Sequence, residues 1–143
     1  METGESTGHL GELFLRVGKR MRAMQAERFA PFGLTPAQAQ VLSLVARSQT
    51  PPRMAELAEQ LGVVPRAVTP LVDALERADL VHRRIDPRNR RSTLLDLTDR
   101  GAAMRQTLRD ERLRAAEDLF APLTHEQRAT LLELLETVAA NGM

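Results

Sequence analysis

The chain has 143 residues, with 20 basic and 19 acidic side chains and a net charge of +1. This length is typical of one domain, and it is long enough to bury a core without disulfides or a metal ion. The absence of cysteine excludes a disulfide framework, a thiolate nucleophile and a cysteine zinc site. With no tryptophan or tyrosine and only four phenylalanines, the chain also lacks the aromatic side chains of a base-stacking platform.

The basic residues are concentrated in one short segment. Lys19 is the only lysine, and an excess of arginine over lysine is typical of GC-rich genomes, so the composition alone is no functional signal. Residues 83–91 carry a local net charge of +4, from Arg83, Arg84, Arg88, Arg90 and Arg91 against Asp86. Planar guanidinium groups suit the recognition of phosphates and base edges. The small whole-chain charge therefore hides a focused basic patch.

The N-terminal third predicts a tail and one long helix. Residues 1–8 are polar, lack the apolar run of a signal peptide and are expected to be disordered. Residues 9–30 predict a helix that Pro31 and Gly33 end. Its apolar side chains recur at three- and four-residue spacing, which places them on one face: Leu10, Leu13, Phe14, Val17, Met21, Met24 and Phe29.

Three shorter helices are expected next. Thr35, Pro36 and Gln38 form a start signal with a capping box and a proline at the first helical position, for a helix that runs to about Arg47. A short helix is expected at 53–61, with Gly62 as the residue that ends it. A fourth is expected at 65–78, with its apolar stripe formed by Val68, Leu71, Val72 and Leu75.

The apolar period then changes from that of a helix to that of strands. Residues 81–85 and 93–97 alternate apolar and polar side chains, and residues 86–91 between them form a polar turn. This pattern predicts a β-hairpin with an arginine-rich tip.

Two helices complete the chain. Thr98 and Asp99 begin a long helix at about 99–120, which Pro122 ends, and Thr124 and Gln127 form a capping box for a last helix at about 125–140. The last helix is apolar around more than half of its circumference: Leu131, Leu132, Leu134, Leu135 and Val138. Such a helix needs two packing partners, and another subunit is one candidate.

The order of these elements points to DNA binding. Two short helices joined at Gly62 fit the spacing of a helix-turn-helix, whose second helix enters the DNA major groove. That pattern alone is weak, since any helical hairpin with a glycine turn matches it. A basic hairpin directly after it, which can act as a wing, makes the arrangement much more specific.

The chain resembles the MarR family of winged-helix transcriptional regulators over about residues 10–140. The resemblance is carried by Met54–Gly62 (MAELAEQLG), by Val68, Thr69 and Leu71–Glu76, by Asp86–Arg91 (DPRNRR) and by Leu97–Gly101 (LTDRG). It implies a mainly α-helical fold with a small β-hairpin wing. Residues 35–98 would form the winged DNA-binding lobe, and residues 9–34 and 99–143 the dimerisation helices of a single domain. It also implies a palindromic operator and release by a small ligand.

Three positions depart from the pattern of the family. Val64 stands where a capping residue is frequent, although Pro65 suits the first turn. Pro70 stands where a basic or small residue often faces DNA, and it removes the hydrogen bond to the carbonyl of Arg66. Either the helix starts at Pro65 and is kinked at Pro70, or its regular part starts at Pro70 with Thr69 as the cap; we favour the earlier start. Asn89 replaces a frequent aspartate and makes the wing tip more basic.

The resemblance assigns DNA contacts residue by residue. On the recognition helix they are Arg66, Thr69, Pro70 and Arg77, and on the wing Arg84, Arg88, Arg90 and Arg91. Arg77, near the far end of the helix, is either a phosphate contact or a member of a surface ion pair, and the alternative role of Arg91 is structural. Arginine can bind guanine in a bidentate manner, and an arginine in a narrow minor groove senses an enhanced negative potential. Arg53, just before the first motif helix, could touch a phosphate. The resemblance further suggests that Asp86 pairs with Arg91 to hold the wing.

A small-molecule effector pocket is a weaker expectation. Where the dimer helices meet the DNA-binding lobe, it would be lined by Met21, Met24, Phe29, Phe32 and Met104; the interpretation that we favour is that these are core residues. The three histidines are too scattered for a metal site, and no catalytic residues, cofactor or membrane contact are expected.

The sequence therefore predicts a cytoplasmic, nucleoid-associated repressor that binds double-stranded DNA as a homodimer, and not an enzyme. The alternative is a winged-helix protein–protein interaction module, or an anti-regulator, without sequence-specific DNA binding; the departures at Val64 and Pro70 motivate it. Binding to the promoter of its own gene would discriminate between the two.

Overall fold

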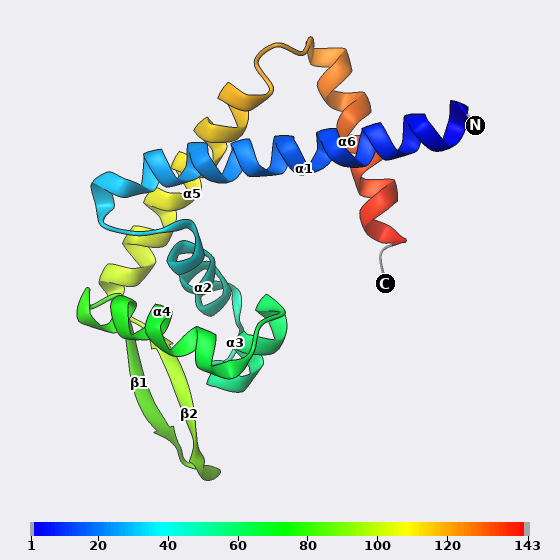
Figure 1. Cartoon of the computed structure of the whole chain (residues 1–143). Coiled ribbons are helices and arrows are strands. Elements are labelled where there is room, and N and C mark those ends of the chain that lie inside the picture. The colour runs from blue at the N-terminus through cyan, green and yellow to red at the C-terminus, as the bar shows by residue number, and fades with distance from the viewer. Residues whose placement is uncertain (1, 142–143) are drawn as a thin grey trace.

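The computed structural model describes residues 2–141. Six α-helices, one short 3₁₀ helix and one hairpin follow each other along this part of the chain (Figure 1). Their bounds are α1 Glu2–Phe29, η1 Ala30–Phe32, α2 Pro36–Arg47, α3 Met54–Leu61, α4 Pro65–Arg77, β1 Val81–Asp86, β2 Asn89–Leu97, α5 Asp99–Leu119 and α6 His125–Ala140. The predicted fold class, mainly helical with a small hairpin, is confirmed.

The molecule has two unequal parts. The winged lobe (residues 35–98) holds α2, α3, α4 and the hairpin, which projects from its lower edge in Figure 1. The helical arm (residues 3–28 of α1 together with α6) lies on the opposite side, and α5 runs from the lobe toward the arm. No helix of the described residues is long and apolar enough to cross a membrane.

The core lies inside the winged lobe. Leu42, Leu57 and Val72 have no exposed surface, and Phe29 from α1 and Leu108 from α5 extend this core toward the arm. Full burial of one such side chain contributes about 1.5–3 kcal/mol. The lobe therefore has enough apolar burial to set the positions of α4 and the hairpin.

Threonine caps begin three of the helices as the sequence predicts. The hydroxyl of Thr35 accepts from the backbone N–H of Gln38, and the Gln38 side chain accepts in return from the backbone of Thr35. Thr124 and Gln127 form the same capping box at α6. At α5 the Thr98 hydroxyl accepts from the N–H of Gly101 at 2.9 Å.

Gly101 forms the joint between the lobe and α5. A Cβ atom at this position would lie 2.0 Å from the carbonyl oxygen of Leu80, which is backbone and cannot swing away. The N–H of Thr98 donates to that same carbonyl at 3.1 Å, and the Thr98 hydroxyl donates to the carbonyl of Asp79 at 2.7 Å. These contacts give a physical reason for the threonine and the glycine of the LTDRG segment.

The N-terminal segment differs from the expectation. Residues 2–8 are helical, because α1 begins at Glu2 and not near residue 9; Met1 lies outside the described residues, as do residues 142–143 of the last predicted segment. The acidic Glu5 suits a helix N-terminus, and the Thr7 hydroxyl bonds the carbonyl of Thr3 at 2.7 Å. Residues 3–8 are exposed, so burial in the described chain contributes little to this turn.

The wing turn is shorter than the predicted one. β2 begins at Asn89, and Asp86 pairs with Asn89, so Arg90 and Arg91 belong to the strand and not to the turn. The antiparallel register shifts between Ile85, which pairs with Thr93, and Asp86. The side chain of Asn89 accepts from the N–H of Arg91 at 3.1 Å, which stabilises the irregular tip.

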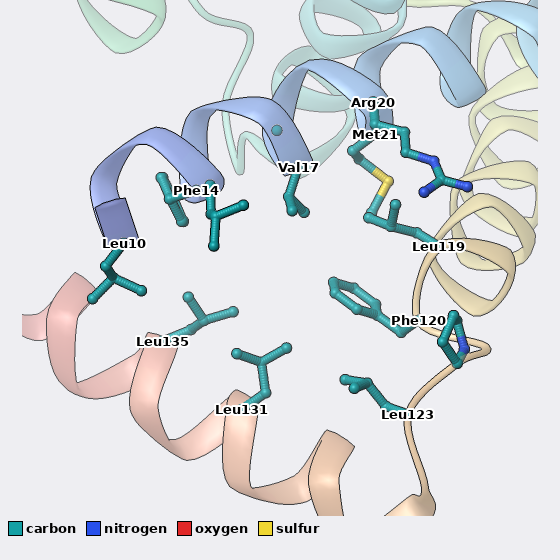
Figure 2. A pocket seen from close by; sticks show the side chains of 13 residues that line it. Leu10, Phe14, Val17, Arg20, Met21, Leu119, Phe120, Leu123, Leu131 and Leu135 are labelled. Carbon is teal, nitrogen blue, oxygen red and sulfur yellow. The ribbon is translucent and has the colours of Figure 1, made fainter. Parts of the chain in front are cut away.

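The arm leaves a large apolar surface uncovered. The side chains of α1 and α6 face each other across an open groove of about 550 Å³ (Figure 2). Leu10 and Phe14 of α1 are 67% and 60% exposed, and Val138 of α6 is 71% exposed. No residue of α6 is buried.

Candidate nucleic-acid interface

The turn between α3 and α4 sets the orientation of the second helix. Gly62 ends α3 with a φ of 70°, a left-handed conformation that favours glycine. Val64 precedes α4 without a side-chain cap, and Pro65 occupies the first helical position. The predicted early start is confirmed, because α4 runs from Pro65 through Pro70 to Arg77.

Pro70 is tolerated because α4 is held by its buried stripe. A proline inside a helix costs about 3 kcal/mol or more. Val68, Val72 and Leu75 are fully buried, and each contributes about 1.5–3 kcal/mol. Their burial outweighs the lost hydrogen bond, so α4 continues past the proline.

The predicted contact residues of α4 share one exposed face. Arg66, Thr69, Pro70 and Arg77 are all exposed, and their helical spacing places them within one side of the helix. Neither Arg66 nor Arg77 has an ion-pair partner within the described chain. This face is therefore available to a partner.

Three wing arginines are similarly available. Arg88, Arg90 and Arg91 are exposed at or beside the tip of the hairpin, and no ion pair involves them among residues 2–141. The tip thus carries three uncompensated cations. Figure 1 shows the hairpin extending away from the body of the lobe.

The other two arginines of the basic patch are neutralised. Arg84 pairs through Nε with Oδ2 of Asp96 at 2.5 Å, across the hairpin. Arg83 reaches α4 and pairs with Asp73 at 2.5 Å and Glu76 at 2.7 Å. The local charge of +4 over residues 83–91 therefore overstates the free charge, because Asp73, Glu76 and Asp96 lie outside that segment.

The predicted Asp86–Arg91 pair is wrong for the described residues. Asp86 is 4% exposed. Its Oδ2 lies 3.4 Å from Nε of Arg53, and its Oδ1 accepts a hydrogen bond from the backbone N–H of Arg88 at 2.9 Å. Arg53 also lies 3.9 Å from Glu56. Arg53 thus holds the wing against the start of α3. The sequence predicted only a phosphate contact for this residue.

The five residues of the predicted methionine and phenylalanine pocket lie in different surroundings. Phe29 is a core residue at 1% exposure, Met104 packs against the core, and Phe32 is exposed. Met21 lines the apolar groove between α1 and α6, away from the lobe. Met24 is half-buried on α1. The spacing of apolar residues predicts an apolar face on each helix. It does not predict whether a given side chain packs in the lobe core or lines the groove of the arm.

A polar cavity that the sequence did not indicate lies between α1, α2 and α5. Its volume is about 640 Å³, and its lining residues, none of them acidic, are Arg22, Gln25, Pro36, Ala37, Gln40, Ser43, Arg47 and Arg112. Burial lowers the pKa of Arg112, and the neighbouring cations Arg47 and Arg105 lower it further. Arg112 Nη2 donates to the carbonyl of Ala39 at 3.2 Å, and its guanidinium lies 5.8 Å from the Phe29 ring centroid. The cavity therefore gathers positive charge without a carboxylate.

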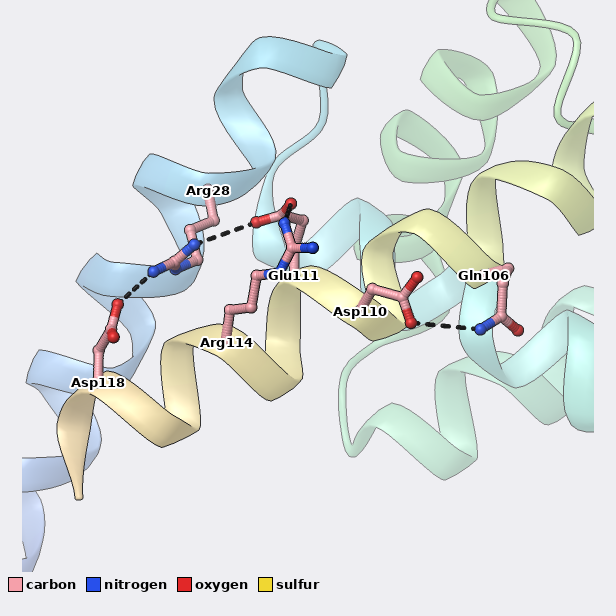
Figure 3. Close-up of polar contacts among 6 residues, drawn as sticks. All are labelled: Arg28, Gln106, Asp110, Glu111, Arg114 and Asp118. Carbon is pink, nitrogen blue, oxygen red and sulfur yellow. Dashed lines mark hydrogen bonds and ion pairs between the residues drawn. The ribbon is translucent and has the colours of Figure 1, made fainter. Parts of the chain in front are cut away.

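Ion pairs connect α1 to α5 beside this cavity. Arg28 of α1 pairs with Glu111, at 3.3 Å, and with Asp118 (Figure 3). These contacts raise the pKa of Arg28, most strongly through the hydrogen bond to Asp118. Arg114 also pairs with Glu111, at 3.2 Å. The network fixes the end of α1 against α5, where the arm joins the lobe.

These features define a class of protein. A helix pair with a glycine turn, an exposed face on its second helix and a hairpin with free arginines form a winged helix-turn-helix DNA-binding lobe. No group of three or more histidine and acidic side chains that could hold a metal ion occurs in the described residues.

Comparisons with known proteins agree with this class. The sequence model described as "MarR family" matches residues 34–93. The HTH-type transcriptional repressor Rv2887 of Mycobacterium tuberculosis is 33% identical over 134 residues, which cover 92% of this chain and 94% of that protein. A MarR mutant from E. coli complexed with operator DNA has a TM-score of 0.77 and 30% identity, over 90% of this chain and 92% of that one. CouR from Rhodococcus jostii RHA1, bound to p-coumaroyl-CoA, has a TM-score of 0.75 and 26% identity, over 91% of each chain.

The chain belongs to the MarR family, and it is a DNA-binding transcriptional regulator. Its curated relatives are named as transcriptional regulators rather than enzymes. The resemblance that the sequence motifs indicated is confirmed.

Proposed function

We propose that the chain is a cytoplasmic, nucleoid-associated repressor that binds a palindromic operator as a homodimer and is released by a small anionic ligand. The DNA-binding part rests on one observation: an exposed face of α4 and a basic wing occur in the same lobe. Arg88, Arg90 and Arg91 of this wing have no carboxylate partner in the described chain. In this proposal α4 enters the major groove and the wing tip reaches the neighbouring minor groove.

The contacts divide by chemistry. Arg66 and Thr69 would read base edges near the start of α4, and Pro70 would contribute apolar contact without a hydrogen bond. Arg77, at the far end of the helix, would bind phosphate. The wing arginines 88, 90 and 91 would supply the minor-groove contacts, whereas Arg84 is held by Asp96 and would contribute less.

The apolar groove of the arm supports the homodimer. Leu10 and Phe14 of α1 and Val138 of α6 are all more than half exposed, and exposed apolar side chains gathered around a groove are typical of an interaction site. A second copy presents the same surface, and a two-fold interface needs such a self-complementary patch. Two winged lobes held about 34 Å apart could then enter successive major grooves. The expected dimerisation segments, 9–34 and 99–143, contain this groove, and its residues 119–135 lie in the second of them.

Selection of bound DNA from a random pool tests the DNA-binding proposal. We expect a palindrome whose half-sites lie about 10 base pairs apart, and affinity that falls steeply with salt because phosphate contacts release counterions. Arg90→Ala should weaken binding about tenfold or more without changing the dimer. The matched control is Arg109→Ala on an exposed face of α5, which should bind like the wild type. Affinity independent of salt, or wild-type affinity of Arg90→Ala, would contradict the proposal.

The polar cavity supports the ligand part. Arg22, Arg47 and Arg112 line it without a carboxylate among the lining residues, and the first turn of α2 adds its N-terminal dipole. An anion would neutralise these charges. The cavity lies between α1, α2 and α5, so a ligand in it would contact both the arm and the lobe. A ligand that binds more tightly when the lobe is displaced from its DNA-bound position would lower the affinity for DNA by that difference in ligand affinity.

Benzoate and its uncharged amide, benzamide, test the predicted charge of the ligand. Benzoate should release the operator at millimolar concentration, benzamide should not, and Arg47→Ala should abolish the benzoate effect while leaving DNA binding in its absence intact. Equal effects of the two compounds, or no effect of either, would contradict an anion site.

The alternative is an interaction module without sequence-specific DNA binding, and the continuity of α4 supports the DNA-binding proposal over it. The alternative rests on Val64 and Pro70, and α4 begins directly after the first and runs through the second.

A further inference from the structure

Arg83 is the one arginine of the basic patch whose side chain reaches α4. Its Nη1 donates to Oε1 of Glu76 at 2.7 Å, and its Nη2 donates to Oδ1 of Asp73 at 2.5 Å. Its backbone N–H donates to the second carboxylate oxygen of Glu76 at 2.9 Å. The side chain is 26% exposed. Side chain and backbone of one wing residue therefore bind the recognition helix together.

The two carboxylates suit a guanidinium rather than an ammonium group. Asp73 and Glu76 stand three residues apart, so they are neighbours on one face of α4. The planar fork of arginine presents two separate donors to two acceptors at once, whereas a lysine offers one point charge. Hydrogen bonds from the backbone and side chain of Arg83 lower the pKa of Glu76. Burial by itself lowers the pKa of Arg83, but the bonds to the two carboxylates outweigh it and raise the pKa.

Arg84 provides the contrast within the same strand. Its partner Asp96 lies on β2, so this ion pair joins the two strands of the hairpin and crosses to no other element. Arg83, by comparison, joins the hairpin to α4. Adjacent residues of one strand thus make ion pairs to different elements, and of the two only that of Arg83 can influence the angle between wing and helix.

The bridge also covers a negative charge on the DNA-facing side of α4. Asp73 is related to Arg66 and Pro70 by seven and three residues, so it lies on the face that carries the predicted contacts. An uncompensated carboxylate there would repel phosphates. Arg83 neutralises it without using a wing-tip arginine.

We propose that Arg83 is a positioning residue for DNA binding: its bridge to Asp73 and Glu76 holds the wing at the angle at which the wing tip and α4 reach one operator together. The proposal rests on the proposed DNA contacts of α4 and of Arg90. It assigns Arg83 no contact with DNA itself.

A double-mutant cycle with Arg90 tests this role. Arg90→Ala is combined with Arg83→Met or with Arg84→Met, and affinity for the selected operator is measured by fluorescence anisotropy at fixed salt. Methionine keeps an unbranched stem and removes the charge. In the wild type and in Arg84→Met, Arg90→Ala should weaken binding by the same factor, about tenfold. In Arg83→Met that factor should fall to about twofold or less, because a misplaced wing no longer brings Arg90 to the groove.

The two failures are distinguishable. If Arg90→Ala leaves wild-type affinity unchanged, the wing contact proposed above is wrong, and the role of Arg83 falls with it. If the Arg90→Ala factor is equal in all backgrounds, the wing contact stands and the positioning role of Arg83 is overturned.

A second pair of variants covers the case in which Arg83→Met does not fold. Glu76→Ala removes one anchor of the bridge, and Asp96→Ala is its charge-matched control because it breaks only the pair within the hairpin. Both variants are checked for melting temperature and dimer mass. Glu76→Ala should reduce the Arg90→Ala factor and Asp96→Ala should not; equal factors in the two overturn the proposal.

Discussion

The winged lobe buries its apolar side chains, whereas the helical arm leaves most of its apolar side chains exposed. In the lobe, residues such as Leu57 and Leu95 have no exposed surface, and the core is continuous from α2 to β2. In the arm, α6 has no buried residue and leucines of α1 face an open groove. Both regions are comparably rich in leucine, so composition does not distinguish them. The difference indicates that the lobe stabilises its own fold, while the arm supplies a surface that needs a partner.

Charged residues divide in the same way. Ion pairs of the lobe orient the wing, through Arg53 with Asp86 and Arg83 with α4. Those near the arm, around Arg28, lock α1 to α5 and leave the apolar groove untouched. The ion pairs of the lobe thus orient its DNA-binding elements, and those near the arm leave free the apolar groove that we propose as the dimer interface.

The largest effect is expected from truncation inside the lobe core. Leu57→Ala should lower the free energy of unfolding by about 2–5 kcal/mol, because it leaves a cavity at a fully buried site. Leu113→Ala, at a leucine of α5 that is 60% exposed, should change it by less than about 0.5 kcal/mol. Denaturant titration measures both. Similar losses in the two variants would erase the contrast between buried and uncovered apolar residues.

A charge in the groove of the arm should separate the subunits. Phe14→Glu is expected to weaken the dimer about 100-fold, or about 2.7 kcal/mol, because a carboxylate would be buried without a partner. The lobe of the Phe14→Glu variant should still melt cooperatively, because its core lies outside the groove. Ala26→Glu, on an exposed side of α1 away from the groove, is the control and should remain dimeric. Light scattering over a range of protein concentrations tests this, and an unchanged dimer would contradict the assignment of the groove.

Two glycine substitutions should have opposite signs. Gly101→Ala is expected to destabilise the protein by about 1–3 kcal/mol, because its Cβ would overlap the Leu80 carbonyl at the joint of lobe and α5. Gly8→Ala, with no atom near its Cβ, should stabilise α1 by up to about 1 kcal/mol through helix propensity. Thermal melting resolves the two. Destabilisation by both would mean that the start of α1 is as tightly packed as the joint.

The smallest expected effect concerns pH. The folded-state pKa of Glu76 lies below its ordinary value of 4.5, so its bridge contributes stability above that pH, and the contribution is lost as the pH falls through the folded-state pKa. Glu76→Gln should therefore be less stable than the wild type at pH 7, by about 0.2–1 kcal/mol as for partly exposed ion pairs, and the difference should shrink progressively as the pH falls below 4.5. A difference that is constant with pH would show that charge is not its source.

Much of the fold could be predicted because its signals are local. The capping boxes at Thr35 and Thr124, the turn at Gly62 and the change of period at Val81 each depend on neighbouring residues, and each element formed where these signals stand. The motif that runs from α3 through the wing is also contiguous in the chain. The sequence alone therefore predicts a DNA-binding motif.

The candidate site was only partly predictable, since its ion pairs join distant residues. Sequence reasoning placed Arg66, Arg88 and Arg90 on exposed surfaces but could not see that Arg53 would hold Asp86. The arginine cavity likewise draws one residue from each of three helices, Arg22, Arg47 and Arg112, and no spacing rule links them.

The sequence by itself determined the order and type of the elements, the winged helix-turn-helix and the basic character of the wing. It did so because hydrogen-bonded caps, turns and apolar periodicity act over a few neighbouring residues. Only the tertiary structure decided which arginines remain free for DNA, which of them hold the wing, and which apolar face stays uncovered. Ion pairs and apolar contacts form over a few ångströms in space, and separation along the chain does not specify that distance.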